Sequence, residues 1–307
     1  MNQLEQLRQM TVVVADSGDI DAIRRLQPVD ATTNPSLILQ AGMQAQYRPL
    51  LNAALQQHRN DLNAACEQVT VNFGVEILRH IPGRVSTEID AHLSFDTSAS
   101  VDSALRIIQR YQAAGIPPER VLIKLAATWQ GIQAAAQLEK QGIHCNLTLL
   151  FNFAQAVAAA DAGVTLISPF VGRISDYYKA AQGITCFRPE QDPGVLSVKA
   201  IYNHYKQHGF RTIIMGASFR SAEQVLALAG CDRLTISPAL LAELASSELP
   251  VMRQLTPTPH QQPAPAPLSE SAFRWQLNEC PMTCDKLADG IRRFARDQEA
   301  LELLLQG

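Results

Sequence analysis

The stretch Val121-Leu122-Ile123-Lys124-Leu125 is an apolar run interrupted by one lysine. Its length, its β-branched residues and the upstream Gly115-Ile116-Pro117-Pro118 predict a buried strand. Burial disfavours a charged ammonium, and the neutral amine that results is a nucleophile for carbonyl groups. Two interpretations of Lys124 therefore stay open. It forms a Schiff base with a substrate, or it is buried beside a carboxylate or reaches out from the strand end.

Seven further stretches share the length and composition of this strand. With Val121–Leu125, the predicted strands are Thr11–Asp16, Asp30–Asn34, Val85–Asp90, Asn146–Leu150, Leu166–Phe170, Thr212–Ala217 and Leu234–Ser237.

Stretches with helical periodicity alternate with these strands: Ala99–Ala114, Gln130–Gln141, Phe153–Ala162, Val198–His208 and Ser221–Leu228. Several helix ends meet a glycine where a left-handed residue is needed, at Gly115, Gly142, Gly163, Gly209 and Gly230. Eight alternating strands predict an α/β protein with a closed (β/α)₈ barrel of the TIM type. A doubly wound open sheet is the alternative, but no glycine-rich nucleotide-binding motif follows any strand.

Three segments depart from the repeat. Residues 34–80 are too long for one crossover and predict extra helices at Ala41–His58 and Leu62–His80. The proline-rich segment 256–267 predicts an extended surface stretch. A C-terminal helix is expected over 286–305, with Leu287, Ile291, Phe294, Leu301 and Leu305 on one face. That face must pack on the outside of the barrel, the rim of its mouth or a second subunit. We expect one domain spanning residues 1–307.

Composition narrows the function. The 307 residues are 47% hydrophobic, and 26 Lys and Arg against 29 Asp and Glu give a net charge of −3, which predicts no nucleic-acid surface. The start lacks the apolar core of a signal peptide, and no later run predicts a membrane span, so a cytoplasmic protein is expected. The six scattered cysteines have no metal-ligand spacing, and we expect no metal site and free thiols.

Polar residues gather at the predicted carboxyl ends of the strands, where such barrels place their chemistry. Each has a structural explanation of its own, such as a helix cap or a buried hydrogen bond. A polar interior contributed by six strands is costly unless function requires it. The residues are Asp16, Asn34, Glu88, Asp90, Lys124, Asn146, Thr148, Ser168 and Ser218.

In their order along the chain, these motifs resemble the transaldolase family from near Leu7 to Leu304. The resemblance is carried by 13–19 (VVADSGD), 30–37 (DATTNPSL), 85–90 (VSTEID), 123–131 (IKLAATWQG), 145–151 (CNLTLLF), 167–173 (ISPFVGR) and 215–220 (MGASFR). The chain length is similar to that of the longer bacterial and eukaryotic members, which implies a homodimer with a C-terminal extension.

The resemblance implies transfer of a dihydroxyacetone unit from sedoheptulose 7-phosphate to glyceraldehyde 3-phosphate, without metal or organic cofactor. Lys124 would form the imine and Asp16 would take the hydroxyl proton. Glu88, with Thr148 holding a water, would move protons during imine formation. The residues implied to bind the three-carbon unit are Thr32, Asn34, Asn146, Ser168 and Phe170.

The resemblance also implies a phosphate site made of Arg173, Ser218 and Arg220, for which planar guanidinium groups are suited. Phe170 follows Ser168 by two residues, and its ring is expected to face the mouth. Ser175 and Tyr177 depart from the pattern, because relatives commonly carry a larger apolar residue and a tryptophan there. Two other functions stay open: an aldolase that releases free dihydroxyacetone, and a barrel without catalytic activity.

Overall fold

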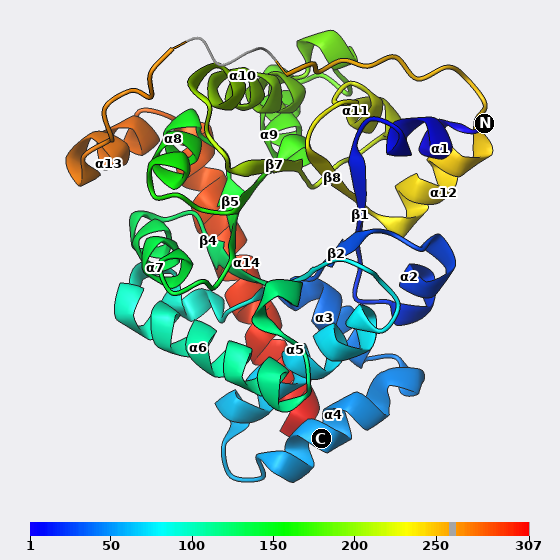
Figure 1. The fold of residues 1–307 in the computed structure, drawn as a ribbon, viewed down its shortest axis with the longest axis vertical. Coiled ribbons are helices and arrows are strands. Elements are labelled where there is room, and N and C mark those ends of the chain that lie inside the picture. Colours follow the sequence, from blue (N-terminus) through cyan, green and yellow to red (C-terminus); the bar gives the residue numbers. More distant parts are fainter. Residues whose placement is uncertain (258–261, 307) are drawn as a thin grey trace.

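The computed structural model describes residues 1–257 and 262–306. Eight parallel strands follow one another around a closed barrel, and β8 pairs with β1 (Figure 1). The expected (β/α)₈ barrel is therefore confirmed, and the open sheet is excluded. The strands are β1 (Val12–Asp16), β2 (Asp30–Thr32), β3 (Val85–Glu88), β4 (Val121–Ala126), β5 (Cys145–Leu150), β6 (Leu166–Pro169), β7 (Ile213–Gly216) and β8 (Arg233–Ile236).

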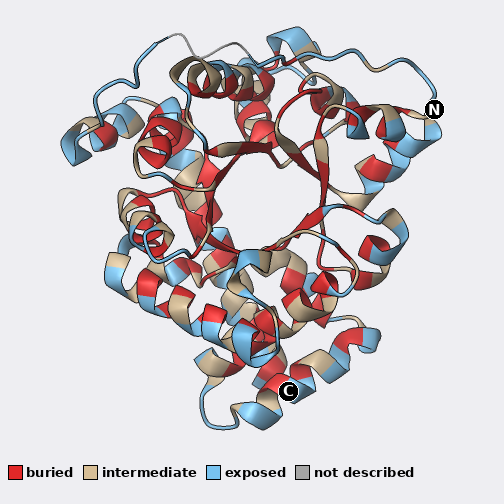
Figure 2. Ribbon diagram, in the orientation of Figure 1, coloured by how far each residue is buried: buried red, intermediate tan, exposed pale blue. Residues whose placement is uncertain are grey.

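Helices surround this barrel on all sides, while the strands themselves are almost wholly buried (Figures 1 and 2). The helices up to β5 are α1 (Gln3–Arg8), α2 (Ile20–Leu26), α3 (Pro35–Gly42), α4 (Arg48–Gln57), α5 (Leu62–Leu78), α6 (Thr97–Ala113) and α7 (Trp129–Glu139). Those after β5 are α8 (Phe153–Asp161), α9 (Val171–Gln182), α10 (Pro193–His208), α11 (Ala222–Leu226), α12 (Pro238–Ser246), α13 (Glu270–Asn278) and α14 (Pro281–Gln306). Short 3₁₀ turns include η1 (Ala45–Tyr47) and η2 (Ala91–Phe95).

Local sequence explains where many helices start and stop. Asp19, Thr128, Asn152 and Asp192 are N-caps whose side chains accept hydrogen bonds from the first-turn N–H groups. The glycines expected at helix ends adopt left-handed backbone, with φ between +70° and +100°. They are Gly115, Gly142, Gly163, Gly209 and Gly230.

One predicted helix is wrong. Residues 41–58 do not form a single body, because α3 already starts after its cap Asn34 and ends at Gly42. A 3₁₀ turn follows, and α4 restarts at Arg48 with Pro49 in its first turn, where the missing N–H costs nothing. α9 was not among the predicted helices, whereas the helix predicted over 62–80 is present as α5.

The C-terminal helix is present and starts earlier than predicted, with Pro281 as its first residue. It packs against α3, η2 and α9, which follow β2, β3 and β6, and also touches β5. α14 therefore lies across the carboxyl ends of the strands, and its apolar face contacts the rim of the barrel (red in Figure 1). Of the expected apolar face, Ile291, Phe294, Leu301 and Leu305 are buried.

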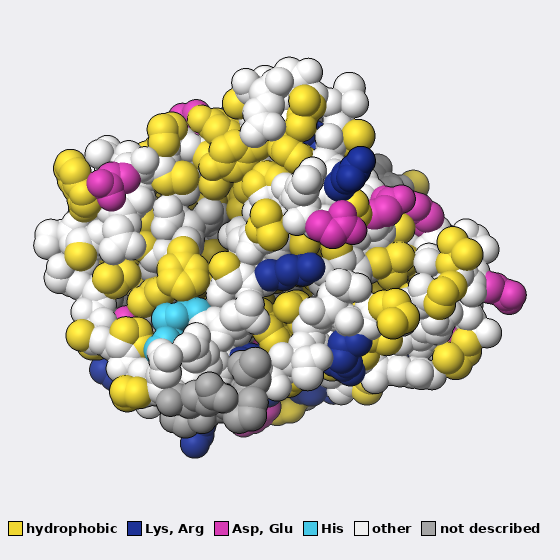
Figure 3. Space-filling model, turned by 90° about the horizontal axis from the view of Figure 1, so that it is seen from above, with side chains coloured by type: hydrophobic (Ala, Val, Ile, Leu, Met, Phe, Trp, Pro, Cys, Tyr) yellow, Lys and Arg dark blue, Asp and Glu magenta, His cyan; other side chains and the backbone are white. Residues whose placement is uncertain are grey.

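The surface carries charges of both signs, as the net charge of −3 leads one to expect. Within the proline-rich segment, residues 258–261 lie outside the described part of the chain, and the other residues of 256–267 form no helix or strand. Lys, Arg, Asp and Glu side chains are few on the described part of the face in Figure 3, and a small group of them with both charges lies to the right of its centre. No helix between residues 1 and 257 or 262 and 306 has the length and apolar character to cross a membrane.

Candidate active site

An apolar layer fills one end of the barrel interior. Val14, Leu122, Leu166 and Met215, from four different strands, form this layer. Successive side chains on one face of a strand are two residues apart, so the next inward residue on each strand lies nearer its carboxyl end. On β1, β4 and β6 those residues are Asp16, Lys124 and Ser168. The interior thus changes from apolar to polar towards the end where such barrels carry their sites.

Lys124 is buried in the middle of this polar layer. Its Nζ lies 2.9 Å from Glu88 Oε2, and both side chains are 5% exposed. The two residues are level because β3 pairs with β4 in a register that sets Glu88 beside Lys124. Nζ also donates a hydrogen bond to the Thr33 carbonyl oxygen at 3.1 Å. Lys124 is therefore buried beside a carboxylate, which was one interpretation of this lysine. It also lines the cavity, as a lysine that forms a Schiff base must.

Both buried carboxyl groups hold their protons more tightly than usual. Burial raises the pKa of Glu88, although the nearby Lys124 opposes this effect. Burial also raises the pKa of Asp16, again opposed by Lys124 and by a hydrogen bond from Thr32 Oγ1 to Asp16 Oδ1 at 2.8 Å. Thr32 Oγ1 in turn lies 2.6 Å from Thr235 Oγ1. Such carboxyl groups are suited to giving and taking protons at moderate pH.

Polar groups on β5 and β6 complete this wall. Ser168 Oγ donates to Asn146 Oδ1 at 2.7 Å, and Asn146 Nδ2 donates to Ser86 Oγ at 3.0 Å. Thr148 Oγ1 is buried at the cavity and has no hydrogen-bond partner among the described residues. A buried hydroxyl of this kind costs free energy unless a ligand or water satisfies it.

Asn34 contributes from the connection between β2 and α3. Its Oδ1 accepts a hydrogen bond from the Leu37 N–H at 3.0 Å, so Asn34 has a structural role as the N-cap of α3. The side chain also lines the cavity. The cap uses the oxygen, and the amide nitrogen is left as a donor for a ligand.

Arg173 forms the outer end of the site. Its guanidinium carbon lies 4.9 Å from the centre of the Phe170 ring and 5.5 Å from that of Phe294. Burial, and then the charges of Arg293 and Arg220, lower the pKa of Arg173 to about 10, so it stays a cation at neutral pH. Its buried Nη1 has no hydrogen-bond partner among the described residues. A desolvated cation with a free donor is suited to an anion.

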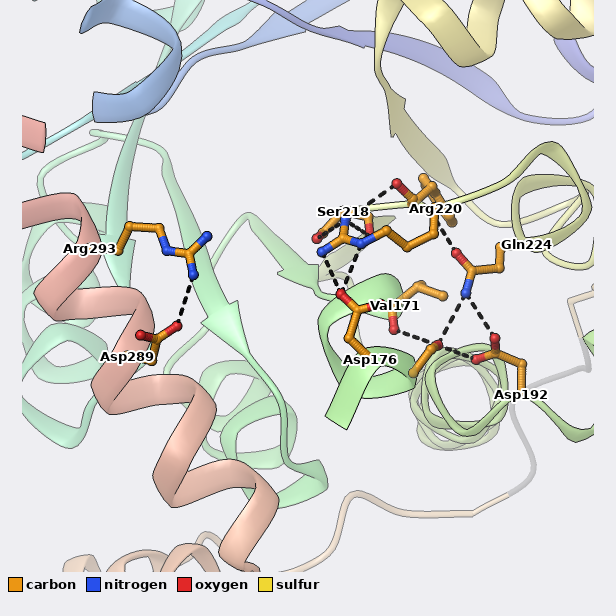
Figure 4. Close-up of polar contacts among 10 residues, drawn as sticks. Val171, Asp176, Asp192, Ser218, Arg220, Gln224, Asp289 and Arg293 are labelled. Carbon is orange, nitrogen blue, oxygen red and sulfur yellow. Dashed lines mark hydrogen bonds and ion pairs between the residues drawn. The ribbon is translucent and has the colours of Figure 1, made fainter. Parts of the chain in front are cut away.

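Arg220 lies beside Arg173 on the loop after β7. Its Nε and Nη2 each lie 2.9 Å from Asp176 Oδ2, while Nη1 turns towards the Ser218 hydroxyl at 3.4 Å (Figure 4). Ser218 adopts a left-handed backbone with φ of 60°. Asp176 therefore fixes one edge of the guanidinium and leaves the other edge near Ser218.

A cavity of about 200 Å³ joins these groups. It brings together ten of the predicted site residues: Asp16, Thr32, Asn34, Lys124, Thr148, Ser168, Phe170, Arg173, Ser218 and Arg220. Glu88 and Asn146 lie one layer behind it, in contact with Lys124 and Ser168. The sequence did not identify five further lining residues, Ala217, Phe219, Thr235, Ser237 and Phe294.

Some of the missed residues carried a signal. Thr235 and Ser237 are two apart at the end of β8, which is the spacing that indicated Asn146 and Thr148. Phe294 was predicted only as part of the apolar face of the C-terminal helix, for which the rim of the mouth was one of three packing surfaces. No cluster of three or more His, Cys, Asp or Glu side chains with metal-ligand geometry occurs within 1–257 and 262–306.

The chain is similar to known proteins of one family. The model of the transaldolase/fructose-6-phosphate aldolase family matches residues 13–305. Transaldolase 1 of Pectobacterium atrosepticum is 58% identical over 312 residues, covering 99% of each chain. Transaldolase of Yersinia pseudotuberculosis serotype IB is 57% identical over 311 residues, covering 99% of this chain and 98% of the relative. Transaldolase of Glaesserella parasuis is 55% identical over 312 residues, covering 99% of each.

Proposed function

This chain belongs to the transaldolase family, and we propose that Lys124 is the residue that forms the imine in its reaction. The protein is an enzyme of the transferase class. It transfers a dihydroxyacetone unit from sedoheptulose 7-phosphate to glyceraldehyde 3-phosphate, giving erythrose 4-phosphate and fructose 6-phosphate in the non-oxidative pentose-phosphate pathway.

The observation that carries the proposal is the buried pair of Lys124 and Glu88 at the cavity, 2.9 Å apart. An ammonium group cannot attack a carbonyl, so Nζ must first lose a proton. Glu88 is in contact to take it, and its raised pKa favours holding it. The amine then attacks the ketose carbonyl, and loss of water gives the imine. A water held by Thr148 serves the proton transfers of this step and of its reversal.

Asp16 is the proposed base for carbon–carbon cleavage. It takes the proton from the hydroxyl next to the breaking bond, that oxygen becomes the aldehyde, and the bonding electrons move into the protonated imine. The three-carbon unit then waits on Lys124 as an enamine until an acceptor aldehyde arrives. The direct contacts of Asp16 with Thr32 keep its carboxyl in place.

The other proposed site residues hold the substrate. Asn34 and Ser168 donate to or accept from hydroxyls of the three-carbon unit, and Thr32 lies beside them. Asn146 acts by orienting Ser168, since it lies behind the cavity wall. Arg173, Ser218 and Arg220 bind the phosphate at the outer end of the cavity.

Phe170 favours transfer over release. Its buried ring lines the cavity, lies edge-on to Phe151 at 5.5 Å between centres, and offers no hydroxyl to hold a water. An ordered water near the enamine would protonate it and lead to free dihydroxyacetone, and an apolar wall discourages such a water.

A coupled assay with fructose 6-phosphate, with and without erythrose 4-phosphate, tests this proposal. We expect wild-type turnover to require the acceptor and to be unaffected by EDTA. Phe170→Tyr adds only a hydroxyl and should raise acceptor-independent release of dihydroxyacetone relative to transfer by about tenfold, the scale of one hydrogen bond. An unchanged ratio in a folded variant would show that Phe170 does not protect the intermediate. Turnover by wild type without acceptor would favour the aldolase alternative.

The remaining proposals concern the oligomeric state, the domain organisation and the cellular location of the enzyme. Resemblance to the longer transaldolases supports a homodimer of single-domain chains, each spanning residues 1–307, that works in the cytoplasm on sugar phosphates. Light scattering coupled to size exclusion tests the dimer, and a molecular mass of one chain at micromolar concentration would contradict it.

A further inference from the structure

Three buried polar side chains lie behind the arginines of the proposed phosphate site. Ser175 belongs to α9, Asp192 caps α10, and Gln224 belongs to α11. They are 0%, 3% and 5% exposed. None of them lines the cavity of about 200 Å³, so the reaction itself gives no reason for burying them.

The three side chains are hydrogen-bonded to one another. Ser175 Oγ donates to Asp192 Oδ1 at 2.6 Å and also lies 3.0 Å from the Val171 carbonyl oxygen of its own helix. Gln224 Nε2 donates to Asp192 Oδ2 at 2.8 Å (Figure 4). It also donates to Ser175 Oγ at 3.1 Å. Asp192 Oδ1 also accepts the first N–H groups of α10, at 2.8 and 3.2 Å, where the helix dipole favours a carboxylate. Each of the three side chains is therefore hydrogen-bonded to the other two, and these bonds hold all three in place.

This set is joined to both arginines. Gln224 Oε1 accepts the backbone N–H of Arg220 at 2.8 Å, which fixes the main chain of that residue. Arg173 lies on the same helix as Ser175, two residues before it, in the first turn. A side chain that holds α9 and the Arg220 loop together therefore holds the two guanidinium groups at a constant separation.

We propose that Ser175, Asp192 and Gln224 are a positioning unit that sets the spacing of Arg173 and Arg220, and so makes the enzyme selective for phosphorylated substrates. This rests on the proposed role of the two arginines. Two cations bind one phosphate well only when both reach it at once, so an error in their spacing costs affinity without removing a charge.

The unit also accounts for a departure from the family pattern. Ser175 occupies a position where the resemblance leads one to expect a larger apolar residue. In this chain the hydroxyl donates to Asp192 and accepts from Gln224, so an apolar side chain would remove two of the three bonds that join these side chains.

The test uses Ser175→Ala and Gln224→Met in the full-length enzyme. KM for fructose 6-phosphate and the inhibition constant of inorganic phosphate should both rise about tenfold, the scale expected for losing hydrogen bonds to a charged group. We expect kcat to change by less than about twofold, and kcat/KM with unphosphorylated fructose as donor to stay the same. Should Gln224→Met fail to fold, Ser175→Ala carries the test.

Two control variants separate positioning from general damage. Ser103→Ala removes a buried hydroxyl that contacts Glu67 on the outside of the barrel, and should change neither constant. Gln155→Met removes another buried amide, whose Oε1 accepts hydrogen bonds from the N–H groups of Phe151 and Asn152. This variant should affect turnover of phosphorylated and unphosphorylated sugar donors equally.

An unchanged phosphate inhibition constant in folded Ser175→Ala, or an equal loss with both donors, would overturn the proposal. Arg220→Ala distinguishes the two levels of inference. If it weakens phosphate inhibition and Ser175→Ala does not, only the positioning unit is wrong. If Arg220→Ala has no effect, the phosphate site itself is wrong.

Discussion

Burial raises the pKa of Asp16, while the charge of Lys124, a hydrogen bond from Thr32 and the charge of Arg173 oppose this effect. Of these opposing groups, the Thr32 hydroxyl can be removed without changing a charge. Thr32→Val removes the hydroxyl and keeps the shape, so the pKa should rise further. If Asp16 must be ionised to act as the base, the acid limb of kcat/KM should move to higher pH by about 0.5 to 1, the equivalent of one hydrogen bond. A pH–rate profile measures this.

Thr235→Val is the matched control. It removes the partner of Thr32 Oγ1 at 2.6 Å and leaves the bond to Asp16 in place. Its acid limb should move less than that of Thr32→Val. If the acid limb of folded Thr32→Val coincides with that of wild type, Asp16 is not the group whose ionisation limits the rate.

Residue type and spacing predicted much of the site. Lys124 was identified because a lysine inside an apolar strand is costly, and Asp16 and Ser168 because they end strands whose carboxyl ends meet. The resemblance to the family, and not residue type or spacing, predicted a catalytic role for Glu88, and its contact with Lys124 depends on strand register, which no local pattern specifies. Phe294 was predicted on the apolar face of the C-terminal helix, but its contact with Arg173 was not, because that contact depends on the path of a helix far along the chain.

At the scale of elements, the start of α9 lies very close to the loop after β7. The Gly172 N–H donates to the Ser218 carbonyl oxygen at 2.8 Å. A Cβ at Gly172 would lie 2.2 Å from that oxygen and 2.7 Å from Arg220 Cγ, so the backbone would have to move. Gly172→Ala should therefore separate the two arginines, raise KM for fructose 6-phosphate at least tenfold, and lower Tm by several degrees, as overpacking typically does.

Gly74→Ala provides the comparison for this prediction. Its Cβ would collide with the Tyr111 hydroxyl between α5 and α6, away from the phosphate site. We expect a similar loss of Tm with an unchanged ratio of KM between phosphorylated and unphosphorylated donors. A normal KM for fructose 6-phosphate in Gly172→Ala would show that this close contact does not set the phosphate site.

Element boundaries were harder to predict than element order. The eight strands were all predicted within one or two residues, because apolar β-branched runs end at turn residues. The region 41–58 was predicted as one helix because residues 34–80 are too long for a single crossover. The break there comes from the early cap at Asn34 and from Pro49, which favours the first turn of a new helix.

For the whole molecule, a polar barrel interior lowers stability in return for activity. Because folded Asp16 has a raised pKa, the folded protein holds this proton to higher pH than the unfolded chain. Stability from this group is therefore greatest below the ordinary carboxyl pKa of 3.8 and falls as pH rises through the raised value.

Asp16→Asn should remove this penalty. Its gain in Tm over wild type should be larger at pH 8 than at pH 4, on the order of 1–3 °C, while turnover is lost. Thermal melts at the two pH values measure the difference. A gain that is larger at pH 4 would mean that the Asp16 carboxylate stabilises the fold instead.

The central claim is that Lys124 forms the imine, and trapping that imine tests it most directly. Borohydride added with fructose 6-phosphate should reduce the intermediate and leave a three-carbon group on one lysine, located by peptide mass spectrometry. Lys206→Arg is the control, because Lys206 is another partly buried lysine and is paired with Asp232. This variant should still be labelled on Lys124. Lys124→Arg should be neither labelled nor active, because a guanidinium stays protonated and cannot attack. We predict the group on the peptide that contains Lys124, and a group on any other lysine, or on none, would contradict the assignment.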